Sequence, residues 1–120
     1  MSIPIIDLFA GPGGLGEGFS SVRDSADRPA FHLGLSIQKE VSAFNSLTLR
    51  AAYRRLREAG HSSHYFDLVR GSINWVEFQN VPIVKEALSE ASNEARQHEL
   101  GKANEREIDG EIREALRGTD

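Results

Sequence analysis

The sequence predicts an α/β fold built around a parallel sheet, and three observations support this prediction. An apolar run at residues 3–9 has the right length for one buried strand. A glycine-rich turn follows at residues 11–14, and a helix-compatible segment comes after it. A second apolar segment, residues 31–37, then supplies a strand that a right-handed crossover would place parallel to the first. Together these segments predict the opening of a nucleotide-binding α/β unit.

The turn contains Gly11, Pro12, Gly13 and Gly14, and with Gly16 it matches the G-x-G-x-x-G spacing of dinucleotide-binding proteins. Glycine has no Cβ, so it permits unusual backbone angles and lets a ligand lie against the main chain. Free amides at the start of the following helix supply donors to a polar or anionic ligand group. The turn is therefore a predicted cofactor pocket.

A predicted helix at residues 15–22 and a charged surface loop at residues 23–29 lead to the second strand. In that strand four apolar residues alternate with other residues: Phe31, Leu33, Leu35 and Ile37. An acidic residue, Glu40, follows directly. In nucleotide-binding folds of this topology, a carboxylate at this point accepts hydrogen bonds from ribose hydroxyls. The alternative is an exposed acid that caps the next helix.

Three longer helices are predicted in the rest of the chain. The clearest spans residues 41–57, where apolar residues recur on one face at helical spacing. Another begins at Pro82 and runs to about residue 100. The last spans residues 105–116 and ends at Gly118.

Two polar groups are candidates for binding. Arg50, Arg54 and Arg57 share a face of the helix at residues 41–57, which we interpret as a solvated face, with phosphate contact as the alternative. His61 and His64 are three residues apart, but no third ligand follows at a recognisable spacing. We therefore predict a polar turn there and no metal site.

Composition limits the function further. The chain has 120 residues, enough for one domain at most, and its formal net charge of −4 argues against non-specific wrapping of nucleic acid. It has no signal-peptide pattern and no long apolar span, so we expect a cytoplasmic protein without membrane contact. It has no cysteine, which excludes a disulfide framework, a thiolate zinc site and a cysteine nucleophile.

One stretch resembles the first motif of the cytosine-5 DNA methyltransferases: Asp7-Leu8-Phe9-Ala10-Gly11-Pro12-Gly13-Gly14, followed by Gly18-Phe19. The resemblance implies a Rossmann-like class I methyltransferase sheet that binds S-adenosylmethionine. It also implies that loop backbone groups cradle the amino-acid end of the cofactor, that Phe9 contacts its apolar surface, that Glu40 holds the ribose and that Val41 covers the adenine. The implied cofactor-binding residues are Asp7, Phe9, Ala10, Gly11, Pro12, Gly13, Gly14, Leu15, Glu40 and Val41.

The resemblance covers residues 3–56 and leaves out the catalytic group. The family attacks cytosine with a cysteine from a Pro-Cys motif, and this chain contains no cysteine. We therefore expect no catalytic residue here and no activity from the chain alone. The resemblance implies the N-terminal fragment or subunit of a DNA (cytosine-5) methyltransferase, of bacterial restriction-modification type. The catalytic and target-recognition parts would be absent, and the completed enzyme would bind double-stranded DNA.

The expected domain organisation follows from the count of strands. Residues 1–60 are expected to form a βαβα cofactor-binding half, and residues 61–120 a mostly helical extension or insertion. Only the first two strands of the sheet are expected here, which is too few for a buried parallel sheet. We therefore expect the sheet to continue in a missing C-terminal part or in a complementary polypeptide that carries the Pro-Cys motif.

Two other functions fit the same residues. The glycine spacing and Glu40 also suit NAD, so the chain could be the nucleotide-binding half of an NAD-dependent oxidoreductase. A non-catalytic interaction module with the same fold is the second alternative, and the absence of cysteine suits it equally well.

Overall fold

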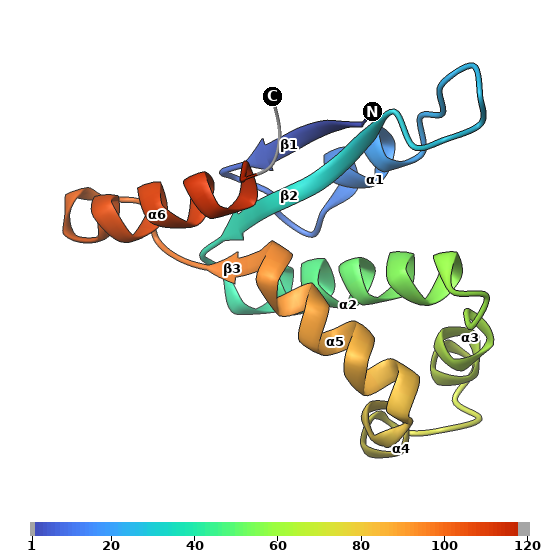
Figure 1. The fold of residues 1–120 in the computed structure, drawn as a ribbon. Coiled ribbons are helices and arrows are strands. Elements are labelled where there is room, and N and C mark those ends of the chain that lie inside the picture. The colour runs from blue at the N-terminus through green and yellow to red at the C-terminus, as the bar shows by residue number, and fades with distance from the viewer. Residues whose placement is uncertain (1, 118–120) are drawn as a thin grey trace.

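The computed structural model describes residues 2–117, which form a three-stranded parallel sheet and six α-helices (Figure 1). The elements in chain order are β1 Ile3–Asp7, α1 Gly14–Ser20, β2 Phe31–Gln38, α2 Val41–Glu58, α3 Ser63–Val69, α4 Trp75–Asn80, α5 Pro82–Glu94, β3 Ala95–Gln97, a 3₁₀ turn Lys102–Asn104 and α6 Glu105–Ala115. The predicted mixed α/β fold with a parallel sheet is confirmed. In residues 2–117, no helix is long and apolar enough to cross a bilayer.

The elements with strong local signals form close to where the sequence predicts them. Helix α2 starts at Val41 behind its cap residue, and α5 has Pro82 in its first turn, where a missing N–H costs nothing. Helix α6 also forms as predicted, with Ile108 buried on the face that meets the sheet. The predicted helix end at Gly118 lies outside the described residues.

The expectation of only two strands is wrong, because the chain supplies a third. The helix predicted from Pro82 to about residue 100 ends at Glu94, and Ala95 adopts extended angles of φ −99° and ψ 123°. Strand β3 then pairs in parallel with β2, with Ala95 opposite Ser36. Alanine, arginine and glutamine favour helices, but the buried position of Ala95 beside the sheet outweighs that preference. The region expected to be a helical extension therefore contributes to the sheet.

A bulge at Gly34 divides the apolar residues of β2 between two faces. Ile5 pairs with Leu33 and Ile6 with Leu35, so Gly34 is the extra residue on β2. Leu33 meets α1 so closely that a Cβ at Gly16 would lie 2.8 Å from its Cδ1 atom. Leu35 instead packs with α6 on the opposite face.

The helices form two layers around the sheet (Figure 1). Helix α6 covers one face through Ile108 and Ile112. Helices α1, α2 and α5 cover the other face, and α3 and α4 extend this layer away from the sheet. The largest buried cluster lies between α2, α4 and α5 and consists of Ala51, Ala52, Leu56, Phe78, Val84, Ala87 and Ala91.

The interpretation of Arg54 as part of a solvated face is wrong. Its side chain is buried in α2 and forms ion pairs with Glu17 of α1 and Glu94 of α5. Arg55 adds a second contact, with its Nη1 atom 3.6 Å from Oε1 of Glu94. Burial raises the pKa of Glu94, and the charges of Arg54 and Arg55 oppose that rise. The network joins α1, α2 and α5 within one layer.

Candidate functional site

The predicted glycine turn lies at the carboxyl end of β1 and is tied to β2. Ala10 donates its backbone N–H to the carbonyl of Ile37 at 2.9 Å, and Gly11 donates to Oε1 of Gln38 at 3.0 Å. Gly11 and Gly13 have φ values of +56° and +97°, a region that favours glycine. These bonds and angles fix the path of the loop over the end of the sheet.

The other predicted loop residues differ in their exposure. Asp7 ends β1 and accepts a hydrogen bond from the backbone N–H of Phe9 at 3.3 Å, which helps close the turn. Phe9 is 82% exposed, whereas Ala10 is buried. Pro12 is exposed on the loop, Gly14 begins α1, and Leu15 extends into solvent from that helix.

Glu40 caps α2 from the end of β2. One carboxylate oxygen accepts the N–H of Ser42 at 3.0 Å, and the other accepts the N–H of Ala43 at 2.6 Å. These two bonds, with that of Ala43 the stronger, hold the pKa of Glu40 below its usual range. The residue is exposed, and its neighbour Val41 is 59% exposed. In the structure Glu40 therefore caps α2, which is the alternative to ribose binding that the sequence predicted.

Phe9 and Glu40 meet at one open cavity of about 380 Å³ at the carboxyl ends of the strands. The cavity is lined by Leu8, Phe9, Gln38, Lys39, Glu40, His98, Glu99 and Leu100. Of the ten predicted site residues, two contribute to this lining within the described part of the chain. Gly11 is linked to the cavity through Gln38, which lines the cavity and whose side chain accepts a hydrogen bond from the Gly11 N–H.

Sequence reasoning missed the residues that follow β3. His98, Glu99 and Leu100 line the cavity because β3 ends beside β2, and the His98 N–H donates to the carbonyl of Gln38 at 3.3 Å. Lys39 and Glu99 form an ion pair of 3.4 Å across the rim. One signal was present in the sequence: the helical spacing of apolar residues stops at Ala95.

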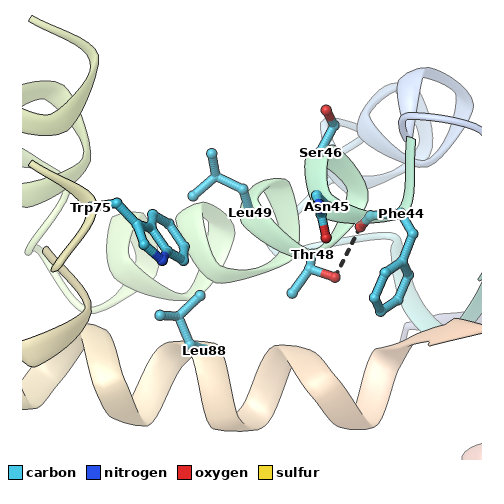
Figure 2. A pocket seen from close by; sticks show the side chains of 7 residues that line it. All are labelled: Phe44, Asn45, Ser46, Thr48, Leu49, Trp75 and Leu88. Carbon is cyan, nitrogen blue, oxygen red and sulfur yellow. Dashed lines mark hydrogen bonds between the residues drawn. The ribbon is translucent and has the colours of Figure 1, made fainter. Parts of the chain in front are cut away.

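A larger cavity of about 500 Å³ lies elsewhere, among the helices. Figure 2 shows Trp75 from α4 and Leu88 from α5 facing side chains of α2 across this cavity. Its α2 lining consists of Phe44, Asn45, Ser46, Thr48 and Leu49. The Thr48 hydroxyl donates to the carbonyl of Phe44 at 3.0 Å, so it is already satisfied. None of these lining residues is charged, and none belongs to the predicted site.

Comparisons with family models, curated proteins and solved structures found no match to this chain.

Proposed function

We propose that this chain is the S-adenosylmethionine-binding part of a DNA (cytosine-5) methyltransferase and that its sheet is Rossmann-like. One observation carries the proposal: Phe9 of the D-L-F-A-G-x-G-G motif and Glu40 line the same cavity at the carboxyl ends of parallel strands. Doubly wound sheets of order 3-2-1-4-5-6 bind ligands in the crevice outside these strand ends. The strand order β1-β2-β3 is compatible with the first half of that order.

The predicted site residues, of which Phe9 and Glu40 line the cavity, suit different parts of the cofactor. The exposed ring of Phe9 offers an apolar surface. A carboxylate has about four acceptor positions, and the helix amides use one on each oxygen of Glu40, so each oxygen retains capacity for a ribose hydroxyl. Val41 offers an exposed apolar contact for the adenine. The loop backbone from Phe9 to Gly14 would hold the amino-acid end.

The chemistry would need groups from outside this chain. When bound, S-adenosylmethionine supplies the methyl group for C5 of cytosine, and the attacking thiolate would come from a Pro-Cys motif on a missing part or complementary polypeptide. That part would also bind double-stranded DNA, with the target base flipped out of the stack. Within residues 2–117, β1 pairs with β2 alone, so its other edge is free to accept a further strand.

Isothermal titration with S-adenosylmethionine tests the proposal, using the full chain alone and together with a polypeptide that carries the Pro-Cys motif. Replacing Glu40 with glutamine removes a charged acceptor and is expected to weaken binding by at least about tenfold. Glu99→Gln is the matched control, because Glu99 is an exposed carboxylate on the rim of the same cavity. Equal affinities of the two variants would contradict the role of Glu40.

Thermal unfolding separates the proposal from its alternatives. A ligand that binds the folded state raises the melting temperature, so S-adenosylmethionine is expected to protect the chain and NAD is not. Protection by NAD instead would favour an oxidoreductase. If neither compound protects the chain, even with the complementary polypeptide present, a non-catalytic module is favoured.

A further inference from the structure

A mixed group of metal-ligating side chains lies between the end of β3 and α6. His98 follows β3, and Glu107 and Glu111 come from successive turns of α6. One ligand atom of each residue lies within 4.8 Å of the other two. We propose that these three residues form a binding site for a divalent transition metal ion of the zinc class.

The geometry of the three side chains supports this site. Nε2 of His98 lies 3.1 Å and 3.0 Å from the two carboxylate oxygens of Glu111, so the imidazole already faces that carboxylate. Ligand atoms around tetrahedral zinc are about 3.4 Å apart, given bonds of about 2.0–2.2 Å. Glu107 is exposed and its ligand atom lies within 4.8 Å of the other two, so a side-chain rotation is the movement by which it would complete the site.

Residue chemistry selects the class of metal. One imidazole and two carboxylates match the nitrogen and oxygen ligands of zinc sites, and three protein ligands leave a fourth position for water. Magnesium and calcium favour all-oxygen sets, so an imidazole ligand disfavours them. His98 and Glu111 are both partly buried, which reduces competition from solvent.

One neighbouring cation opposes metal binding. Nε of Arg96 lies 3.9 Å from Oε1 of Glu111, and this buried nitrogen has no hydrogen-bond partner among the described residues. Its positive charge repels a bound cation and competes with that cation for the carboxylate of Glu111. Removing the charge of Arg96 should therefore strengthen metal binding, which a purely structural ion pair between His98 and Glu111 does not predict.

A metal at this site would act on the candidate cofactor cavity. His98 belongs to both groups, since it also lines the cavity that contains Glu40. A shared ion would join α6 to the end of β3 and hold the His98 side of the rim in place. This inference is independent of the proposed methyltransferase function, because it requires only residues 98–111.

The proposal is tested by titrating the full chain with zinc. Isothermal calorimetry measures the affinity, and thermal unfolding measures the stabilisation. Zinc is expected to bind the unmodified chain and raise its melting temperature, whereas magnesium is not. Loss of an outer partner of a zinc ligand already costs about 10- to 100-fold in affinity, so His98→Gln should weaken zinc binding by at least about tenfold. Glu107→Gln should also weaken it, and this exposed helix-surface change leaves folding intact.

Two further variants complete the test. Arg96→Gln is expected to strengthen zinc binding by about two- to fivefold, the effect of removing one partly exposed charge. The double change His61→Gln and His64→Gln is the control. The centroids of these two rings lie 6.2 Å apart elsewhere in the chain, so the pair could bind zinc adventitiously. The proposal is overturned if the unmodified chain does not bind zinc, if His98→Gln binds it unchanged, or if the control variant loses binding.

Discussion

Replacing Arg54 with methionine tests the buried network that joins α1, α2 and α5. The substitution keeps most of the side-chain volume but leaves Glu94, only 5% exposed, without its main partner. Removing one partner of a buried ion pair costs about 3–5 kcal/mol. Glu17 is 29% exposed and Arg55 stays 3.6 Å from Glu94, so the lower end of this range, about 3 kcal/mol, is expected.

Chemical denaturation followed by circular dichroism measures the loss as a change in unfolding free energy. Arg50→Met is the matched control, because Arg50 is exposed on the same helix and its loss should change stability by no more than about 0.5 kcal/mol. Adding Glu94→Gln to Arg54→Met removes the unpaired buried charge and should restore at least about 1 kcal/mol of the unfolding free energy. Equal stabilities of the Arg54 and Arg50 variants, or no recovery in the double variant, would refute this reasoning.

Three more predictions concern packing and pH. Gly16→Ala should lower the unfolding free energy by about 1–2 kcal/mol, because the new Cβ lies 2.8 Å from Leu33. Gly18→Ala should raise it by about 0.5–1 kcal/mol, because the new Cβ meets nothing within 4 Å. Chemical denaturation should therefore show opposite shifts in midpoint for the two variants. Phe78→Ala should cost about 3–5 kcal/mol in the same assay, because this ring is fully buried. Folding lowers the pKa of Glu40, so its carboxylate should stabilise the fold at neutral pH and lose that effect as pH falls through the lowered pKa. In Glu40→Gln, the melting temperature should therefore change less over this acidic range than in the unmodified chain.

The fold was predictable wherever the decisive signal was local. The apolar run of β1, the cap at Glu40 and the apolar spacing of α2 each lie within one short segment, and each element forms near its predicted bounds. Strand β3 was not predictable in this way. Its three residues favour a helix, and only their pairing with β2, about 60 positions earlier, makes them a strand.

The candidate site shows the same division. Phe9 was selected through the motif that resembles the methyltransferases and Glu40 through its position just after a strand, and each of these signals lies within one short segment. His98 could not be selected in this way, because its position depends on β3. The burial of Arg54 was also missed, since its partners lie 37 and 40 positions away and a charge row on a helix carries no sign of them.

The course of α6 bears on how the sheet could be completed. This helix begins after β3 at one edge of the sheet and crosses the face opposite to α2 and α5 (Figure 1). Its Ala115 reaches Gly34, where a Cβ would lie 3.4 Å from the Ala115 carbonyl oxygen and 3.7 Å from that of Ile5 in β1. A helix that returns from the third strand to the first is what a doubly wound order of 3-2-1-4 requires, because the fourth strand pairs with the first. Within residues 2–117 the other edge of β1 is unpaired, and we propose that a further strand of the sheet, if one is supplied by a complementary polypeptide, adds there, next to the glycine turn.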